Sequence, residues 1–399
     1  MINVLWMSPY APYDKVGHAG GQIENYYLKE LNKNKDIELF LLSFIDKEEY
    51  KDVKIDLASS NVWNVIIDNN IIKTDKYLDK IRLFNKYGGI IKKDYWNIIE
   101  QNLDENYSKI PDVIVVEWTE FIMFIPEIKS KYPNAKIVSI EEDVTFLKYY
   151  RIIRNQSNLL KKLLWNIRYH HLKKSELKSL AMSDLVILNN SKDEKLVKNK
   201  GIKNTWVWTP YFMNMTKDKK DDFLTRNIVF YGAMARKENH DSVMWFIKNV
   251  LEKINDKDVR FFIVGSKPQK ELLDLASDRI IVTGFVDSVQ PYFQNALCCV
   301  APLVMGAGVK IKVLEAMSAG VPVLTNDIGI EGIEAENKKD YFHCESPEQY
   351  IQAISLLIND KNVGEKMGNS SREFISKNYN YEQDSKVFVN KIKSLGTIK

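Results

Sequence analysis

Cysteine and long apolar runs are scarce in this 399-residue sequence. Two of its three cysteines are adjacent within ALCCVAPL, a pattern that excludes a disulfide framework and a zinc cluster. No run of about 20 apolar residues occurs, so the sequence predicts no transmembrane helix. The first residues, MINVLWMSPYAPYD, lack a basic region followed by a long apolar core, which favours a buried first strand over a signal peptide. We therefore expect a cytoplasmic globular protein.

An excess of one charge is also missing from most of the chain. The net charge is +4, from 57 Lys and Arg against 53 Asp and Glu. Residues 151–200 alone hold 12 Lys and Arg against 4 Asp and Glu, a local charge of +8, so the remaining residues sum to −4. This concentration in one segment argues against a general nucleic-acid-binding protein.

The second half of the chain alternates short apolar runs with stretches of helical periodicity. The runs read as strands in RNIVFYGAM, VRFFIVGS, DRIIVTGFV, ALCCVAPL and GVPVLTN, and the helical stretches include HDSVMWFIKNVLEKI, PQKELLDLA and IKVLEAMSA. Strands that alternate with helices indicate parallel βαβ units with right-handed crossovers. The sequence thus predicts a doubly wound α/β domain from Arg226 to about Asp360.

The first half shows the same alternation less clearly. It predicts helices at about 22–34 and 160–182 and strands in NVLWMS, IELFLLSF, NVWNVII, DVIVVEW, AKIVSIE and DLVILNN, while residues 70–108 are not assigned by pattern. We expect two Rossmann-like domains, 1–208 and 209–375, joined by a linker near TWVWTPYFMNMTKDKKDD. A last helix within 376–399 is expected to pack back on the first domain. Ligands would lie at the carboxyl ends of the strands, in a cleft between the domains.

The stretch GAGVKIKVLEAMSAGVPVL, residues 306–324, follows a predicted strand. A glycine loop lets backbone N–H groups approach a ligand, and the helix behind it directs its positive end there. Lys312 and Glu315 are three residues apart and share a helical face, so one could neutralise a phosphate and the other accept two ribose hydroxyls. Spacing alone favours an ordinary βαβ turn with two solvated charges.

The segment VTGFVDSVQPYFQNALCCVAPLVMGAGVKIKVLEAMSAGVPVLTNDIGIEGI resembles the donor-binding half of retaining GT-B glycosyltransferases of family four, the group 1 glycosyltransferases. FYGAMARKENHDSVMWFIKNVLEKI and FIVGSKP extend the resemblance over about residues 226–335. In the first half, SPYAP…AGGQIENYYLKEL and SDLVILNNSKDEKLV match more weakly. The resemblance implies a GT-B architecture whose first domain binds the acceptor and whose second binds a nucleotide-sugar donor.

The resemblance also implies roles for individual residues. Glu315 would hold the nucleotide ribose, and Lys312 would contact the donor diphosphate. The other implied donor contacts lie in three glycine-containing segments: Gly20 and Gly21 facing the diphosphate, Gly284-Phe285-Val286 lining the base pocket, and Gly306-Ala307-Gly308-Val309 facing the sugar or phosphate.

Two positions depart from the family's pattern. Ala307 stands where the family commonly has a glutamate that reaches the donor sugar. Ala233 stands where it often has an arginine, and Arg236 and Lys237 are our substitutes, with Lys237 preferred. The alternative is that both are solvated loop charges.

The segment Glu141-Glu142-Asp143 stands where the family usually has a histidine-aspartate pair. Glu142 and Asp143 are therefore candidate catalytic residues that would orient the acceptor hydroxyl or take its proton, and a solvated acidic loop is an equal alternative. His18 precedes the glycine pair and could hydrogen-bond a phosphate or the acceptor, although we favour an ordinary loop histidine. His170 and His171 lack acidic neighbours at ligand spacing, so no metal site is predicted.

The basic segment, residues 151–180, mixes leucines and Trp165 with lysines. Its apolar positions are sufficient for a core-facing side, which favours an ordinary amphipathic helix. The alternative is a peripheral contact with an anionic membrane, in keeping with a lipid-linked acceptor.

Together these patterns favour a glycosyltransferase that moves a sugar from a nucleotide diphosphate to an acceptor hydroxyl. The resemblance implies retention of configuration, glycan or lipid-linked acceptors and a place in bacterial surface glycan or polysaccharide assembly. No cofactor or metal is needed if protein cations stabilise the departing diphosphate. A nucleotide-sugar epimerase and a non-catalytic nucleotide-sugar-binding protein remain alternatives, whereas a dinucleotide dehydrogenase is disfavoured because no tight glycine fingerprint follows the first strand.

Overall fold

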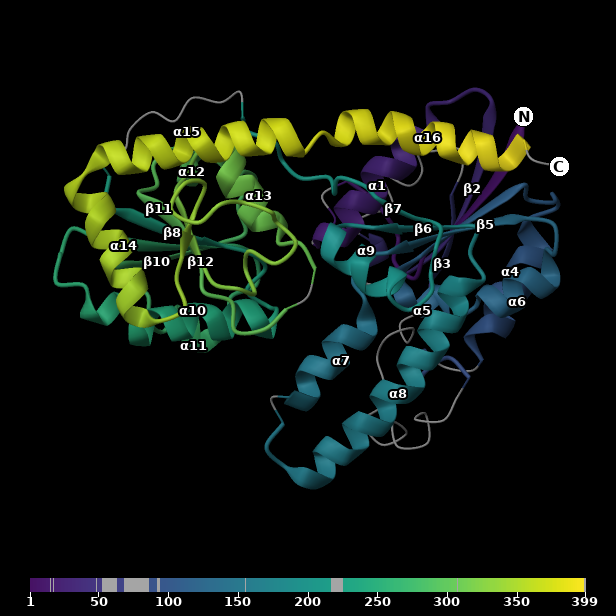
Figure 1. Ribbon diagram of the computed structural model, residues 1–399, viewed down its shortest axis with the longest axis horizontal. Coiled ribbons are helices and arrows are strands. Elements are labelled where there is room, and N and C mark those ends of the chain that lie inside the picture. Colours follow the sequence, from purple (N-terminus) through teal and green to yellow (C-terminus); the bar gives the residue numbers. More distant parts are fainter. Residues whose placement is uncertain are drawn as a thin grey trace. The chain divides into compact units, whose positions relative to one another are not determined.

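The computed structural model describes residues 1–14, 16, 18–47, 49–51, 63–67, 86–91, 94–154, 156–216, 225–306 and 308–397. The chain forms two compact units, which we call the N-domain (Met1–Tyr211 with Tyr381–Lys399) and the C-domain (Phe212–Asn380) (Figure 1). The sequence placed these boundaries a few residues earlier in the chain.

The N-domain is built on a parallel sheet in which β1 is flanked by β2 on one side and β4 on the other. The strand order is β3-β2-β1-β4-β5-β6-β7, and every pair is parallel. The strands are β1 (Ile2–Met7), β2 (Ile37–Ile45), β3 (Trp63–Ile67), β4 (Val113–Glu117), β5 (Lys136–Glu141), β6 (Leu185–Leu188) and β7 (Thr205–Val207). The chain reverses its winding direction between β1 and β4, where side chains from separate strand ends meet.

Helices of the N-domain include one from the far end of the chain. They are α1 (Ala19–Asn32), α4 (Tyr95–Asn106), α5 (Trp118–Ile122), α6 (Ile125–Lys131), α7 (Thr145–Arg154), α8 (Leu159–Ala181), α9 (Ser191–Lys198) and α16 (Tyr381–Thr397). Helix α16 packs on α1 and β1, with the Phe388 and Trp6 ring centroids 6.0 Å apart. Tyr27 of α1 stacks on Trp208 with centroids 3.7 Å apart, so the first and last segments of the chain share one apolar layer.

The C-domain repeats this construction with a six-stranded parallel sheet in the order β10-β9-β8-β11-β12-β13. Its strands are β8 (Asn227–Tyr231), β9 (Arg260–Val264), β10 (Ile280–Gly284), β11 (Cys298–Ala301), β12 (Val323–Thr325) and β13 (Phe342–His343). Its helices are α10 (Lys237–Asn249), α11 (Lys270–Leu273), α12 (Gln290–Gln294), α13 (Ile311–Ser318), α14 (Pro347–Asn359), α15 (Lys361–Asn378) and the 3₁₀ helix η1 (Leu251–Lys253). The predicted pair of Rossmann-like domains is confirmed.

The central strands are buried along their whole length, as in β4 and β11, because helices cover both faces of a parallel sheet. Two short strands were not predicted. Strand β7 falls in the stretch interpreted as a linker, and β13 contains two residues. Among the described residues, no helix combines the length and apolarity needed to cross a bilayer.

The structure corrects the preferred interpretation of the basic segment. Helix α8 buries only residues of its second half, namely Leu172, Glu176, Ser179 and Leu180. The leucines of its first half lie in solvent, with exposed fractions of 81% for Leu159 and 75% for Leu160. An ordinary amphipathic helix with a core-facing side therefore describes only half of α8.

Candidate active site

The predicted strand, glycine loop, helix and strand of residues 298–325 are β11, the following loop, α13 and β12. Two glycines of this loop have positive φ, 153° at Gly306 and 68° at Gly308. The Lys310 ammonium donates to the Gly308 carbonyl, which fixes the loop against the start of α13. Gly308 is buried and Val309 half-buried, while Ala307 lies outside the described residues.

Lys312 projects from the first turn of α13 into the C-domain sheet. Its ammonium donates to Asn239 Oδ1 at 2.6 Å and lies 4.5 Å from the centre of the Phe230 ring. Burial lowers the pKa of Lys312 to about 7, with Arg236 and Lys310 adding to the effect by charge repulsion. An added anion would reverse that penalty, so the geometry suits a ligand phosphate.

Glu315 lies one turn further along α13 and is 4% exposed. Its Oε1 accepts the N–H of Met213 at 3.3 Å. Burial raises the pKa of Glu315 to about 7, against the opposing influence of this hydrogen bond and of the Lys312 charge. A buried carboxylate with a single hydrogen bond on one oxygen retains capacity to accept hydroxyl donors.

Two glycines bring the ends of β8 and β9 into close contact behind Lys312. A Cβ at Gly265 would lie 1.9 Å from the Gly232 carbonyl oxygen, and one at Gly232 would lie 2.8 Å from Lys312 Nζ. Asn239, which holds Lys312, also donates to the Ala233 carbonyl at 2.8 Å. The sequence did not reveal Asn239 or Phe230, because ordinary residues of a helix and a strand give no local signal for this role.

Arg236 and Lys237 occupy the N-terminus of α10, with Arg236 as its N-cap residue. Both are exposed and paired, Arg236 with Glu238 at 2.7 Å and Lys237 with Asp241 at 2.5 Å. The charge of Arg236 lowers the pKa of Lys312, so Arg236 contributes to the electrostatic potential at the Lys312 ammonium. This electrostatic link favours Arg236 over Lys237 as the second cation, and the role of either residue stays a prediction.

The predicted base-pocket segment follows β10. Gly284 has a φ of 70°, which turns the chain at the end of the strand. Phe285 is 69% exposed, and Val286 is half-buried. A large aromatic side chain held in solvent is available to contact a planar base, and this assignment also stays a prediction.

The glycine pair of the first half lies at the N-terminus of α1. His18 is the N-cap residue, and its Nδ1 accepts the Gly21 N–H at 3.0 Å. A Cβ at Gly20 would lie 2.4 Å from Trp118 Cη2 and 3.4 Å from Glu142 Oε2. The structure thus brings the predicted loop, Gly20 and Gly21, beside the predicted carboxylate Glu142.

Trp118 follows β4 with a φ of 66°, a backbone conformation that bulky residues rarely adopt. Its ring lies 5.0 Å from that of Tyr10 and 5.9 Å from that of His18, and its indole N–H donates to Glu24 Oε2 at 3.4 Å. Strained backbone of this kind clusters at functional sites. Trp118 was not singled out from the sequence.

Three buried carboxyls, Glu24, Glu117 and Glu142, gather at the carboxyl end of the N-domain sheet; we call them the carboxyl triad. Trp6 Nε1 donates to Glu24 at 3.2 Å and to Glu117 at 3.1 Å. Asn189 Nδ2 donates to Glu142 at 3.0 Å. Among the described residues, Glu117 Oε1 and Glu142 Oε1 are buried and have no hydrogen-bond partner.

Burial is the main cause of high pKa values in the carboxyl triad. Burial, with a smaller contribution from the charge of Glu142, raises the pKa of Glu24 to about 8. The pKa of Glu142 also rises to about 8, through burial and the charge of Asp143, and that of Glu117 rises well above its usual value. The charges of Glu24 and Glu142 add to the effect of burial at Glu117. The triad therefore holds protons at neutral pH and can exchange them.

The other acidic residues near β5 have structural partners. Glu141 is buried and hydrogen-bonded to Thr119 Oγ1, and burial raises its pKa. Glu176 of α8 accepts the N–H groups of Thr145 and Phe146 at 2.9 and 3.0 Å, which ties α8 to the start of α7. Asp143 is half-buried and acts on Glu142 by its charge. The solvated-loop alternative thus fails for Glu141 and Glu142, which are 1% and 7% exposed.

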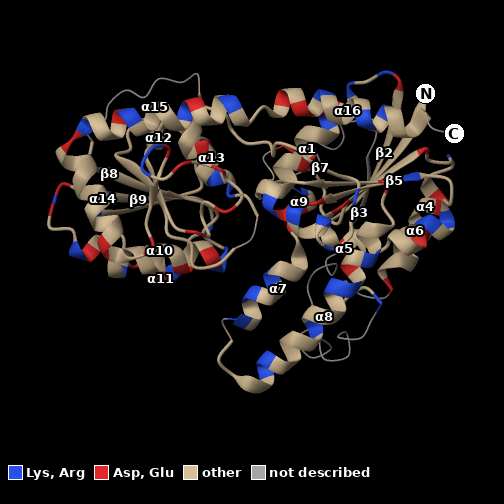
Figure 2. Ribbon diagram, in the orientation of Figure 1, with Lys and Arg blue, Asp and Glu red and all other residues tan. Residues whose placement is uncertain are grey.

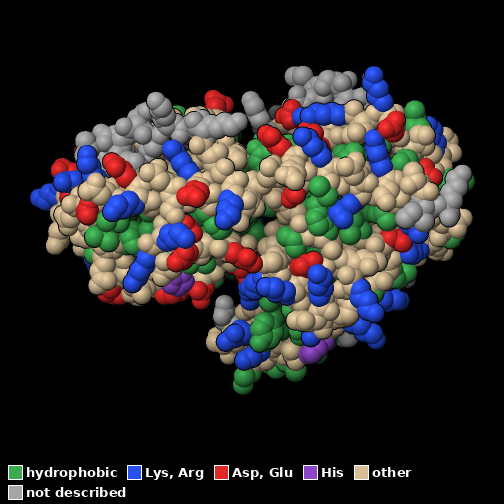
Figure 3. Space-filling view, turned by 45° about the horizontal axis from the view of Figure 1, so that its top comes forward, with side chains coloured by type: hydrophobic (Ala, Val, Ile, Leu, Met, Phe, Trp, Pro, Cys, Tyr) green, Lys and Arg blue, Asp and Glu red, His purple; other side chains and the backbone are tan. Residues whose placement is uncertain are grey.

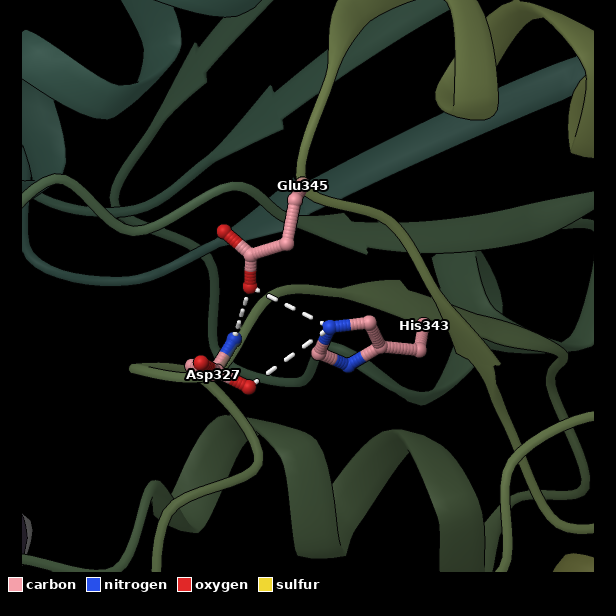
Figure 4. A group of neighbouring side chains, drawn as sticks. All are labelled: Asp327, His343 and Glu345. Atoms are coloured by element: carbon pink, nitrogen blue, oxygen red, sulfur yellow. Dashed lines mark hydrogen bonds and ion pairs between the residues drawn. The ribbon is translucent and has the colours of Figure 1, made fainter.

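One group in the C-domain has the residue types of a metal site. Asp327, His343 and Glu345 lie at the ends of β12 and β13, and their ligand atoms lie within 4.8 Å of one another (Figure 4). His343 Nε2 is 3.5 Å from Asp327 and 3.3 Å from Glu345, whose Oε1 also accepts the Asp327 N–H at 2.7 Å. The Asp327 side chain is 85% exposed. A hydrogen-bonded surface cluster accounts for this group without an ion.

The carboxyl triad was only partly predictable. Glu142 was identified from its place after a strand, whereas Glu24 lies within a helix and Glu117 at the end of another strand. A possible signal was an acid at the end of the apolar run DVIVVE, because the carboxyl ends of parallel strands are where ligands bind.

Comparison with known proteins agrees with this geometry. Residues 225–360 match the family model described as glycosyl transferases group 1. An uncharacterised 44.6 kDa protein in the cps region of Klebsiella pneumoniae is 23% identical over 401 residues, covering 95% of this chain and 97% of that protein.

Solved structures share the fold of the whole chain. A sucrose-phosphate synthase from Thermosynechococcus elongatus matches with a TM-score of 0.72 at 13% identity, over 100% of both chains. HepE from Anabaena, solved in complex with UDP, matches with a TM-score of 0.65 at 12% identity, over 99% of this chain and 100% of that one. Residues 225–360 are thus similar to the group 1 glycosyltransferases, and the two Rossmann-like domains have the GT-B architecture that the sequence predicted.

Proposed function

We propose that this glycosyltransferase transfers a sugar from a nucleotide diphosphate sugar to an acceptor hydroxyl with retention of configuration. The observation that carries the proposal is the pair of buried, oppositely charged residues on α13, directly behind a glycine loop. Lys312 would neutralise the diphosphate, Glu315 would accept the ribose hydroxyls, and backbone N–H groups of Gly306 and Gly308 would approach the sugar. Gly20, Gly21, Phe285, Val286 and Val309 are further proposed donor contacts.

The departing diphosphate would be stabilised by protein cations instead of a metal ion. The charge of Arg236 lowers the pKa of Lys312, and Lys312 would become protonated when an anion binds. UDP is the first nucleotide to test, because HepE was solved with it. Donor binding is expected to be the same in EDTA as in added Mg²⁺.

Glu315→Ala tests the ribose assignment. Loss of two hydrogen bonds to a carboxylate, each contributing about 1.5–3 kcal/mol, should weaken nucleotide binding by at least about a hundredfold. Thermal stabilisation by a panel of nucleotides and nucleotide sugars, followed by calorimetric titration of any hit, gives the affinities. The exposed Glu252→Ala serves as the control and should bind like the wild type. Unchanged nucleotide binding by Glu315→Ala would refute the assignment.

Glu142 is our proposed acceptor-orienting group, because it lies beside Gly20 and burial raises its pKa to about 8. Glu142→Gln should lower kcat by about 10²-fold, a typical loss for a group that takes or orients a proton, and leave the donor KM unchanged. Glu105→Gln, which replaces an exposed acid of α4, is the control. Equal losses in both variants, or a loss confined to the donor KM, would contradict the proposed role.

The high pKa values of the carboxyl triad would also suit a nucleotide-sugar epimerase, which needs acid and base groups at a sugar carbon. Product analysis by NMR, with and without acceptor, separates the two functions. A glycosyltransferase gives an elongated glycan whose anomeric configuration matches the donor. An epimerase alters the donor alone, and a non-catalytic binding protein gives no product.

We propose surface glycan or polysaccharide assembly as the setting, with a glycan or lipid-linked acceptor. The support is the Klebsiella relative, whose name places it in the cps region. All three cysteines are buried and none forms a disulfide, which fits reaction in the cytoplasm. The basic α7–α8 segment fits the inner face of an anionic membrane.

A further inference from the structure

Helices α7 and α8 form a hairpin that extends beyond the sheet of the N-domain (Figure 1). Its base is firmly held. Glu176 caps the start of α7 through two backbone N–H groups, and Leu172 packs against Gly88, where a Cβ would lie 2.8 Å from the leucine side chain. Arg168 donates to the Gly89 carbonyl at 3.2 Å. The hairpin is therefore anchored from about Arg168 towards its base.

In the outer part of the hairpin, the apolar side chains of α8 are exposed. The exposed fractions are 81% for Leu159, 75% for Leu160, 58% for Leu163, 49% for Leu164 and 40% for Ile167. The spacing i, i+1, i+4, i+5, i+8 puts these five side chains on one face of the helix; we call them the leucine face. Because the base is fixed, this face is held away from the domain core.

Charge around the leucine face is of one sign. Residues 144–175 contain eight Lys and Arg and no Asp or Glu. Figure 2 shows the basic residues along both helices, and Figure 3 shows hydrophobic and basic side chains together on the projecting hairpin. Lys161 and Lys162 lie between the leucines in sequence and are exposed. Trp165 and Tyr169 are half-buried beside them, as aromatic residues are at membrane interfaces.

We infer that the hairpin inserts the leucine face into an anionic lipid bilayer, with the surrounding Lys and Arg bound to lipid headgroups. This inference rests on the peripheral membrane contact in the proposed function. It adds insertion of apolar side chains to the electrostatic attraction between the basic residues and the membrane. An anionic bilayer is the occupant that satisfies both features, because it offers negative headgroups directly above an apolar layer. A protein partner would need both an apolar groove and an acidic rim.

The first experiment is flotation of the full-length protein with vesicles of phosphatidylcholine and phosphatidylglycerol at 0.05 and 0.5 M NaCl. The variant Leu159→Ser/Leu160→Ser/Leu163→Ser/Leu164→Ser should bind at least about tenfold more weakly at both salt concentrations. Lys161→Gln/Lys162→Gln should weaken binding mainly at 0.05 M NaCl. At 0.5 M NaCl, salt already screens the attraction between these lysines and the lipid headgroups, so little remains to be lost. Leu273→Ser/Leu275→Ser, which replaces exposed leucines of the C-domain, is the matched control and should bind normally.

A second experiment observes insertion directly. The native cysteines are buried, so Leu160→Cys introduces one accessible thiol for an environment-sensitive fluorophore. Anionic vesicles should shift its emission to the blue, whereas the same label at Leu273→Cys should not respond. Unfolding temperature and nucleotide binding confirm that each variant is folded, and neither vesicle assay needs donor or acceptor, so failure here leaves the proposed transferase activity standing.

Three outcomes would overturn the inference. They are no binding of the wild type to anionic vesicles, equal binding by the four-leucine variant, and dimerisation through the leucine face. The last is recognised by light scattering as a dimer of the wild type that the four-leucine variant does not form and that vesicles do not dissociate.

Discussion

Lys312 has a pKa near physiological pH, and this follows from its burial beside Phe230 and Asn239. Because Lys312 can lose its proton near this pH, its burial costs the ligand-free protein little free energy. It becomes a full cation when a diphosphate arrives, so charge appears only when a ligand pairs with it.

This titration gives a prediction about donor binding. The protonated fraction of Lys312 falls as pH rises through about 7, so affinity for UDP should decrease between pH 6 and 8.5. Lys312→Arg keeps its charge throughout, so its affinity should fall several-fold less over this interval. The comparison at each pH cancels the titrations of UDP and of Glu315, and calorimetry provides the values. Parallel pH profiles for the two proteins would contradict the predicted role.

The sequence singled out Lys312 and Glu315 through the family resemblance, because their three-residue spacing alone favoured two solvated charges. It could not identify Asn239 or Phe230, which reach Lys312 from other elements. The same limit applies to Glu24, Glu117 and Glu142, whose meeting depends on the order of strands in the sheet.

At the scale of elements, the approach of β8 to β9 depends on glycine. Gly265→Ala places a methyl group 1.9 Å from the Gly232 carbonyl oxygen, so the two strand ends must separate. We expect a loss of about 3 kcal/mol in the free energy of unfolding, together with weaker nucleotide binding as Lys312 shifts. Gly284→Ala is the control, since its Cβ meets nothing within 4 Å and its φ of 70° costs about 1 kcal/mol. Urea denaturation measures both; equal losses would contradict the steric argument.

The long elements were predictable because their periodicity extends over several turns or a whole apolar strand. Strands β7 and β13, with three and two residues, are too short for a pattern to show. Helix α8 was predicted at 160–182 and found at Leu159–Ala181, but periodicity could not reveal that its apolar positions have no core to face. The exposure of these side chains depends on where the helix lies relative to the domain core. The sequence of the helix alone does not determine that position.

At the scale of the whole molecule, buried acids determine how stability varies with pH. The pKa values of Glu24, Glu142 and Glu176 are raised from 4.5 to about 8, so the folded protein binds more protons than the unfolded chain between these values. Their contribution to stability is complete below about pH 4.5 and is lost as pH rises through about 8. Lys312 opposes this only above about pH 7.

The unfolding temperature should therefore fall by several degrees between pH 6 and 8.5, as measured by calorimetry. Glu142→Gln cannot ionise, and its amide can donate to Glu117, so the variant should show a smaller fall. A wild type whose stability rises over this interval, or a variant with an equal fall, would show that the triad does not hold its protons in the folded state.

The path of the chain has a consequence for synthesis. The N-domain uses the first 211 residues and also α16, whose Phe388 packs on Trp6 and Trp208. A growing chain on the ribosome completes the C-domain first, because residues 212–380 are already made when α16 is not. The aromatic residues Trp6 and Trp208 therefore stay uncovered until α16 has been synthesised. In a chain that ends before residue 381 they would remain exposed, and quality-control proteases would recognise such a chain.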